Sequence, residues 1–211
     1  MSRLFIASLV RHASDSYRVI VTLLAYTGLR LSKAVGLRWQ DIDLVESELR
    51  VRGQLSMARR DRPARIVPAK TAASVRDVPM MPAVECALVE QLEREQRAGR
   101  GPDGDFVFVT RLGTPMHQRN VSVRGVGEAA IAAGLGKVTA HDLRRSLCAL
   151  SGRRGVDPVE AAQITGHSLA VWTKHYARSL GKPQRDEARA RLLEYGFGAV
   201  ETEIRSSPER P

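Results

Sequence analysis

The chain has 211 residues, of which 43% are hydrophobic and 27% charged, a composition suited to one sizeable globular domain with a packed core. No apolar stretch approaches the roughly 18 residues of a membrane-spanning helix, and the two distant cysteines match no disulfide or metal pattern, so we expect a cytoplasmic protein without membrane contact. The formal net charge of +10 favours nucleic acid as the partner, because neutralised phosphates release condensed counterions.

The first third of the chain changes from helical spacing to a strand-rich segment. Apolar residues predict a helix over 16–26 that Gly28 ends, and a second short helix over 31–37. Three further runs predict strands: 48–53, 64–71 and 75–80. Because short turns connect these runs, we expect one small antiparallel sheet with arginine-rich connections.

The remaining two thirds of the chain is predicted to be mainly helical. Helices are expected over 82–98, over 121–133, from a capping pair at Thr139 and Asp142, from 157 to Gly166, in a short segment carrying Tyr176, and over 185–195, with one brief strand over 105–110. The predicted fold class is mainly α with a small three-stranded antiparallel β-sheet (α+β). We expect one domain over 1–200 and a flexible tail over 201–211.

A set of four basic residues and one tyrosine carries the functional interpretation: Arg30, His141, Arg144, His167 and Tyr176. Phosphodiester cleavage requires neutralisation of the phosphoryl oxygens, and a planar guanidinium grips two oxygens at once. The two histidines can donate or relay protons near the two arginines. Nearby cations then favour the phenolate of tyrosine, which makes it a reasonable nucleophile.

These residues stand in motifs that resemble the tyrosine recombinases, or phage-type integrases, over about residues 16–182. The matching segments are Thr27-Gly28-Leu29-Arg30, Leu37-Arg38-Trp39 with Asp41-Ile42-Asp43, Lys70-Thr71, His141-Asp142-Leu143-Arg144-Arg145-Ser146, and Thr165-Gly166-His167-Ser168 followed by Tyr176. Each segment alone is a weak signal, but five in the family's order are hard to obtain by chance. The expected fold is therefore the catalytic domain of that family.

The resemblance implies a DNA recombinase or integrase that needs neither metal nor ATP, and no cofactor. Tyr176 would attack a DNA phosphate, form a 3′-phosphotyrosine and release a 5′-hydroxyl. Arg30 and Arg144 would bind the phosphate, and Lys70 would be the general acid toward the leaving oxygen. By the same resemblance, His141 would assist proton transfer and His167 would hydrogen-bond the phosphate.

The expected partner is double-stranded DNA, bound by a homo-oligomer that is a tetramer on paired sites. Contacts with the DNA backbone are predicted for six arginines: Arg59, Arg60, Arg62, Arg65, Arg76 and Arg145. The predicted helix over 185–195 carries leucines on one face, which suggests packing against a neighbouring protomer.

Two departures from the family leave alternatives open. Lys33 stands where the family often has a glutamate, and fewer than twenty residues precede the first predicted helix, which implies that the family's N-terminal core-binding domain is absent. A DNA-binding remnant or truncated fragment with impaired catalysis is therefore the main alternative, and a type IB topoisomerase is a second. Solvated surface charge without a nucleic-acid partner would also explain the net charge taken alone.

Overall fold

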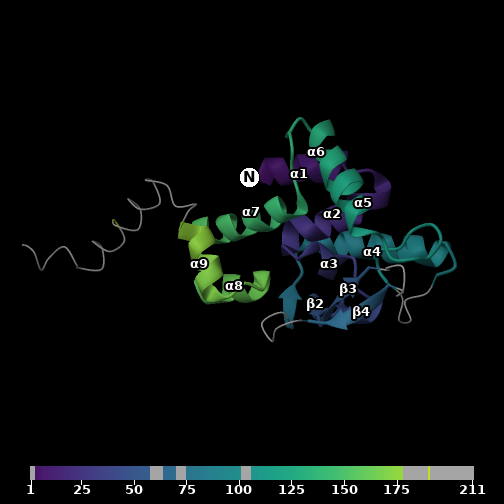
Figure 1. The fold of residues 1–211 in the computed structure, drawn as a ribbon, viewed down its shortest axis with the longest axis horizontal. Helices are drawn as coiled ribbons and strands as arrows, with labels where there is room; N and C mark the ends of the chain where they lie inside the picture. Colours follow the sequence, from purple (N-terminus) through teal and green to yellow (C-terminus); the bar gives the residue numbers. More distant parts are fainter. Residues whose placement is uncertain (1–2, 58–63, 70–74, 101–105, 178–189, 191–211) are drawn as a thin grey trace, which may run out of the picture.

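The structure is a computed structural model, and it describes residues 3–57, 64–69, 75–100, 106–177 and Ala190. Its N-terminal half contains helices α1 (Arg3–His12), α2 (Asp15–Thr27) and α3 (Leu31–Ala34), a 3₁₀ turn η1 (Trp39–Asp41), strands β1 (Ile42–Asp43), β2 (Glu48–Val51), β3 (Gly53–Ser56), β4 (Arg65–Pro68) and β5 (Arg76–Pro79), and helix α4 (Pro82–Arg97). Its C-terminal half contains α5 (Gln118–Asn120), the π-helical η3 (Val121–Gly127), α6 (Glu128–Ala132), α7 (Ala140–Arg153), α8 (Pro158–Thr165) and α9 (Leu169–Ala177). The predicted mainly helical fold class is confirmed (Figure 1).

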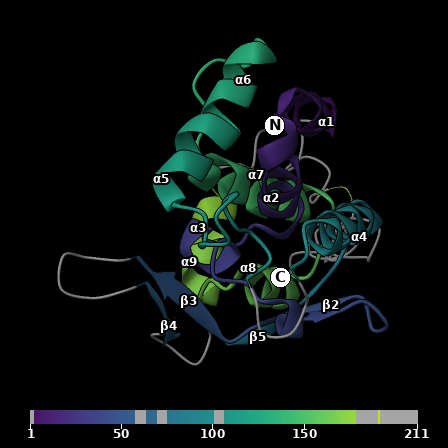
Figure 2. The same ribbon diagram turned by 90° about the vertical axis from the view of Figure 1, so that its right-hand side faces the viewer.

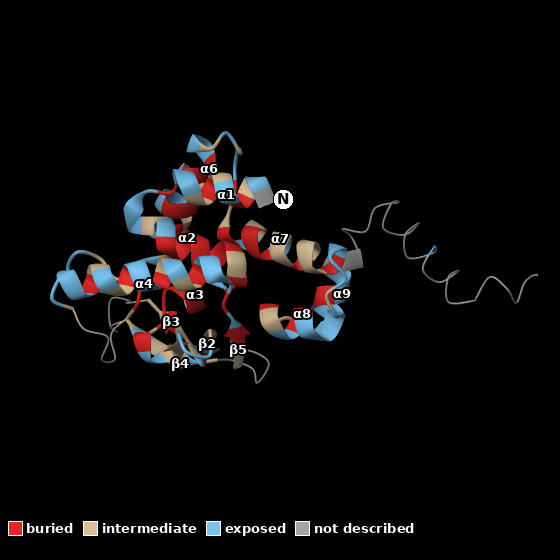
Figure 3. Cartoon of the chain, turned by 180° about the vertical axis from the view of Figure 1, so that it is seen from behind, coloured by how far each residue is buried: buried red, intermediate tan, exposed pale blue. Residues whose placement is uncertain are grey.

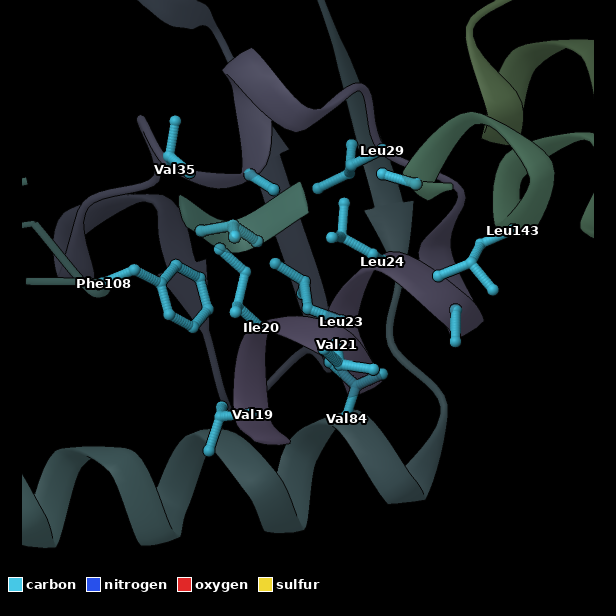
Figure 4. Packing of buried hydrophobic residues seen from close by; sticks show 14 of the residues in the cluster. Val19, Ile20, Val21, Leu23, Leu24, Leu29, Val35, Val84, Phe108 and Leu143 are labelled. Carbon is cyan, nitrogen blue, oxygen red and sulfur yellow. The ribbon is translucent and has the colours of Figure 1, made fainter. Parts of the chain in front are cut away.

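Helix α2 forms the centre of the main hydrophobic core. It packs against α1, α4, α7 and η3, and its residues Val19 to Ala25 are all buried (Figures 3 and 4). The helix ends at Gly28, which has a left-handed φ of 61° and donates its N–H to the carbonyl of Leu24. A Cβ at Gly28 would also lie 2.9 Å from Cδ2 of Leu147. Both the turn and the close packing of α7 therefore require glycine at this position.

The strands form two small sheets instead of the single predicted sheet. One sheet has the order β1-β2-β5 and the other pairs β3 with β4, all antiparallel. The predicted strand over 48–53 divides at Arg52, which is exposed and pairs with Asp77 at 2.6 Å. The chain crosses to the other sheet at Gly53, where a Cβ would lie 2.9 Å from the carbonyl oxygen of Val67. Residues 42–43, where no strand was predicted, form the edge strand β1.

Two other predicted elements differ from the structure. The predicted strand over 105–110 makes only isolated bridges in its described part, Phe106 with Arg38 and Val109 with Pro115. Helix α1 was not predicted, although Ile6 and Leu9 are buried in the main core. The predicted helix over 185–195 except Ala190, the tail over 201–211 and residues 1–2 lie outside the described residues.

Helices α7, α8 and α9 form a lobe with its own small core, made by Cys148, Ala161, Ala162 and Trp172. In Figure 1 this lobe lies beside the main helical body, and in Figures 1 and 2 the strands lie along one side of that body. The lobe is joined to the body where α7 packs on α2 and α8 packs on β5. The end of α2, the start of α7, the end of α8 and strand β5 consequently converge. None of the helices in the described segments is long and apolar enough to cross a membrane.

Candidate active site

Two helices that end in left-handed glycines direct carbonyl groups at one arginine. Helix α2 ends at Gly28 and α8 ends at Gly166, whose φ is 64°. Arg144, the fifth residue of α7, donates from Nη1 to the Gly28 carbonyl at 2.6 Å and from Nη2 to the Gly166 carbonyl at 3.3 Å. The negative ends of two helix dipoles therefore face the Arg144 side chain, which is only 2% exposed.

The start of α7 holds Arg144 in place through the predicted capping pair. The Thr139 hydroxyl accepts the N–H of Asp142 at 3.2 Å, and the Asp142 carboxylate accepts the N–H of Thr139 at 3.0 Å. The hydrogen bond from the Thr139 hydroxyl is the main cause that lowers the pKa of Asp142. This capping box, predicted from the sequence, fixes the start of α7, from which His141 and Arg144 project one turn apart.

Arg30 and His141 lie on the open side of Arg144. Arg30 is exposed, directly between α2 and α3, and its Nη1 lies 3.5 Å from the Gly166 carbonyl oxygen. His141 is exposed on α7. Arg30, His141 and Arg144 all line one surface cavity of about 370 Å³. Arg30 therefore meets His141 and Arg144, which lie more than a hundred positions further along the chain, at one opening.

His167 contacts the far edge of the Arg144 guanidinium. It directly follows Gly166 and is half-buried, and its Nε2 lies 3.1 Å from Nε of Arg144. The last turn of α8 sets this position: the N–H groups of Gly166 and His167 bond the carbonyls of Gln163 and Ala162, which is the pattern of a Schellman motif. The predicted glycine at the end of this helix is thereby the element that brings His167 to Arg144.

A further cation, Arg76 on β5, lies behind this group. Its Nε donates to the carbonyl of Ile164 at 2.9 Å, and both Nη atoms are buried without a hydrogen-bond acceptor among the described residues. The sequence placed Arg76 among the backbone contacts of DNA, whereas the structure places its guanidinium in the interior, against Gly166. The pairing of β5 with β2 in the sheet causes this, because it carries Arg76 to the end of α8.

Burial and mutual repulsion lower the pKa values of these cations. Burial is the first cause and Arg30 the second for both Arg76 and Arg144, whose pKa values fall to about 10. Burial of Lys33, followed by repulsion from Arg76, Arg30 and Arg144, lowers the pKa of this lysine to about 8. The site thus concentrates positive charge, and an anion in the cavity would relieve the repulsion.

A larger cavity of about 460 Å³ lies elsewhere, between α2, α4 and residues 109–117. Its wall contains the ion pair between Arg100 Nε and Glu95 Oε2, at 2.5 Å, and none of the predicted catalytic residues. Among the described residues, four arginines line this cavity against the single carboxylate of Glu95, so it is basic too, but it lacks the predicted catalytic residues and its size does not make it the better candidate for phosphate chemistry.

The sequence matches the Phage integrase family over residues 3–182. The chain belongs to this family. The match extends from α1 to just beyond α9, so it contains every element that forms the site, and it confirms the resemblance expected from the motifs.

Known proteins of the phage integrase family agree with this fold. The tyrosine recombinase XerC of Roseiflexus sp. (strain RS-1) is 27% identical over 180 residues, which cover 82% of this chain and 52% of that protein. The crystal structure of XerA recombinase, 26% identical, has a TM-score of 0.70 and matches 91% of this chain and 64% of that one. The Tn1549 transposon integrase in complex with transposon right end DNA, 21% identical, shares the fold with a TM-score of 0.74, over 92% of this chain and 65% of that one. The chain spans about half the length of the curated relatives it matches.

Several predicted site residues of this integrase-family chain lie outside the described residues: Lys70, Arg59, Arg60 and Arg62. The backbone of Tyr176 lies near the end of α9, which packs on α7 and α8. Arg65 on β4 and Arg145 on α7 are exposed, as a contact with the DNA backbone would require. Their roles, and those of the catalytic residues, remain predictions.

Lys33 stands at the position where the integrase family often has a glutamate. It lies on α3, one turn from Arg30, and is 4% exposed. Sequence reasoning identified the replacement but not the burial, because a lysine on a short helix is ordinarily solvated. Its approach to Arg76 comes from long-range packing, which no local pattern records.

The lowered pKa of Lys33 predicts how stability depends on pH. The pKa is about 8 in the folded chain and 10.5 ordinarily, so between these values the folded chain binds fewer protons than the unfolded chain. The free energy of unfolding therefore rises with pH across that window. We expect Lys33→Met, which keeps the apolar stem, to stabilise the protein by about 1–3 kcal/mol near neutral pH and to remove most of this rise.

Urea denaturation at about pH 7 and about pH 9.5 measures both effects. The control is Lys137→Met, which removes the same charge from an exposed position. Equal behaviour of the two variants would contradict a buried, repelled Lys33.

Proposed function

We propose that this chain cuts and rejoins DNA strands by the tyrosine-recombinase reaction, through a 3′-phosphotyrosine. One observation carries the proposal: Arg30, His141 and Arg144 line a single cavity. The contacts described for Arg30 and Arg144 include no carboxylate that would neutralise their charge. A phosphodiester is the anion that these groups fit, since two guanidinium groups can grip its two non-bridging oxygens.

In the proposed reaction, the Tyr176 oxygen forms a bond to phosphorus while the bond from phosphorus to the 5′ oxygen breaks. The phenol proton is lost as the bond forms, with His141 assisting, and the leaving 5′ oxygen takes a proton from Lys70. Charge that develops on the phosphoryl oxygens is stabilised by Arg30 and Arg144. One phosphoester bond replaces another, so the reverse reaction rejoins the strand without an energy source.

Double-stranded DNA is the proposed partner. The Tn1549 integrase, which has the same fold, was solved with transposon DNA, and Arg65 and Arg145 are exposed on this chain as backbone contacts would require. Recombination further requires paired sites, for which we propose a homo-tetramer. Because the chain spans about half of its curated relatives, these assignments concern the reaction of the catalytic domain.

A nicked duplex tests the proposal, because loss of the short 5′-hydroxyl fragment traps the covalent intermediate. We expect the full chain, incubated with an end-labelled pool of nicked duplexes of randomised sequence, to yield a labelled band at the mobility of a protein–DNA adduct in denaturing electrophoresis. The band should disappear on protease digestion and in the Tyr176→Phe variant. No band with the unaltered chain, or a band that persists in the variant, would overturn the mechanism; relaxation of supercoiled plasmid without partner exchange would favour a topoisomerase.

A further inference from the structure

The larger cavity, between α2, α4 and residues 109–117, has no part in the proposed reaction, yet it carries an excess of positive charge. Among its described lining residues, the carboxylate of Glu95 faces four guanidinium groups, those of Arg94, Arg100, Arg111 and Arg124. These arginines come from α4, the residues just after it, the 109–117 segment and η3. Cations brought together from separate segments repel one another, and an anion between them relieves the repulsion. We call this space, of about 460 Å³, the basic cavity.

A buried hydrogen-bond network in the wall of the basic cavity orients two of the arginines. Gln91 and Glu95 are 4% and 5% exposed, and Nε2 of Gln91 donates to Oε1 of Glu95 at 3.1 Å. Oε2 of Glu95 accepts from Nε of Arg100. Nη1 of Arg94 donates to Oε1 of Gln91 at 3.3 Å and to the Asp15 carbonyl at 3.0 Å. In these contacts each guanidinium is held by one nitrogen, which leaves its other two nitrogens as donors for a ligand.

The open side of the basic cavity adds further donors. Arg111 and Arg124 are exposed, and neither side chain has a hydrogen bond or an ion pair in the part of the chain that the structure describes. His117 also lines the cavity, and its Nδ1 accepts the N–H of Arg119 at 3.1 Å, so the neutral ring carries its proton on Nε2. Converging N–H donors with net positive charge fit a phosphoryl group, because one guanidinium binds two of its oxygens at once.

The helical segment of α5 and η3 separates the basic cavity from the active site. Gln118 and Ser122 line the active-site cavity. Asn120 and Arg124 line the basic cavity, so the two cavities lie on different faces of one segment. A helix with its side chains is about 10–12 Å thick, which corresponds to about three phosphate steps of about 3.4 Å along one DNA strand. A strand that places one phosphate in the active site can therefore present a nearby phosphate to the basic cavity.

We propose that the basic cavity is a second phosphate-binding site of this chain, and that its ligand is a backbone phosphate of the DNA held by the active site. None of the predicted catalytic residues that the structure describes lines it, so it binds the phosphate without cleaving. The assignment to DNA rests on the partner proposed above. The phosphate-binding chemistry itself does not, since a free phosphorylated ligand would use the same donors.

Two double variants of the full chain test the site. Arg111→Gln with Arg124→Gln, the rim variant, removes the two open charges of the basic cavity. Arg11→Gln with Arg97→Gln, the control variant, removes two charges from exposed positions on α1 and α4 that do not line the cavity. All four side chains are exposed, so both variants should fold, and unchanged midpoints in urea denaturation check this.

The first arm measures binding of DNA, by anisotropy titrations with intact duplex of randomised sequence at several salt concentrations. We expect the rim variant to bind about tenfold more weakly at about 0.1 M salt, and its slope of log affinity against log salt to be shallower by about one, because each neutralised phosphate contributes about 0.9 to this slope. The control variant should change the affinity less than about threefold. At saturating nicked duplex, both variants should form the covalent adduct at the unaltered rate.

The second arm titrates pyrophosphate into ¹⁵N-labelled chain without DNA. Amide shifts at residues 109–117 report the basic cavity, and shifts at 141–144 report the active site. We expect pyrophosphate to shift the 109–117 amides of the unaltered chain and of the control variant, and the rim variant to need about tenfold more pyrophosphate.

The two arms together decide the proposal. A loss of affinity and slope that is confined to the rim variant in the DNA arm supports it, with or without a loss in the second arm. A loss in the pyrophosphate arm alone overturns the assignment to DNA and identifies a free phosphorylated ligand. Equal behaviour of the rim and control variants in both arms overturns the site itself. If the unaltered chain forms no adduct, the proposed function fails, while both binding arms still decide whether the basic cavity binds phosphate.

Discussion

Replacing Arg144 with lysine is expected to slow formation of the covalent protein–DNA adduct about 100- to 1000-fold, while affinity for intact duplex changes little. The reason lies in the number of directions that one side chain must serve. Arg144 contacts the Gly28 carbonyl, the Gly166 carbonyl and His167 with three different nitrogens, at 2.6, 3.3 and 3.1 Å. The single nitrogen of a lysine cannot span these acceptors and also present two N–H groups to a phosphate.

The next residue along the chain provides a matched control for this substitution. Arg145 lies on the same helical turn but is exposed, and lysine keeps its charge toward the DNA backbone. Arg145→Lys should change the rate of adduct formation by less than about threefold. Single-turnover rates on the nicked duplex and anisotropy titrations with intact duplex provide the two measurements. Similar losses of rate in both variants would mean that charge alone, and not the fork geometry of Arg144, supports the reaction.

Helix boundaries were predictable because they depend on local chemistry. Gly28 and Gly166 stop α2 and α8 in left-handed conformations, and Thr139 with Asp142 starts α7, as the sequence predicted. These signals act within about four residues and need no tertiary partner. Since Arg30, Arg144 and His167 lie next to such boundaries, the motif that carries most of the candidate site was visible in the sequence.

The division of the strands into two sheets was not predictable in the same way. Alternating residues identify a strand but not the strand it pairs with, because pairing depends on long-range packing. Gly53 was the available signal: glycine inside a strand pattern often marks a bend or a close backbone approach, and here β2 passes into β3 beside Val67. The consequence reaches the site, since the pairing of β5 with β2 carries Arg76 to the end of α8.

Helix α1 escaped prediction for a different reason. Its apolar residues Phe5, Ile6, Leu9 and Val10 do follow helical spacing, but the run is short and its first turn contains no acidic residue. Most of its stability comes from packing against α2 and α6, which sequence windows do not include. The burial of Lys33 could not be predicted for the same reason. A lysine is ordinarily solvated, whereas here tertiary packing buries the side chain and brings Arg76 and Arg144 from distant segments close to it.

Replacing Gly166 with alanine should destabilise the chain by about 2–3 kcal/mol, compared with about 1 kcal/mol for Gly134→Ala. Both glycines are left-handed, with φ of 64° and 67°, so the backbone cost of alanine is similar at the two positions. They differ in their surroundings. A Cβ at Gly134 meets nothing within 4 Å, whereas a Cβ at Gly166 would lie 2.6 Å from Cζ of Arg76.

The difference between the two variants therefore reports how firmly Arg76 is held. Its Nε is bonded to the Ile164 carbonyl at 2.9 Å and its Nη atoms are buried, so the guanidinium has little room to withdraw. Urea denaturation, with the m-value checked for a common unfolded state, measures both free energies. If Gly166→Ala lowers the free energy of unfolding no more than Gly134→Ala does, the Arg76 guanidinium moves aside without strain. The packing of β5 against α8 is then looser than the structure indicates. If the expected gap is found, the displaced α8 terminus should also slow adduct formation in Gly166→Ala alone, because the carbonyl of Gly166 bonds Arg144.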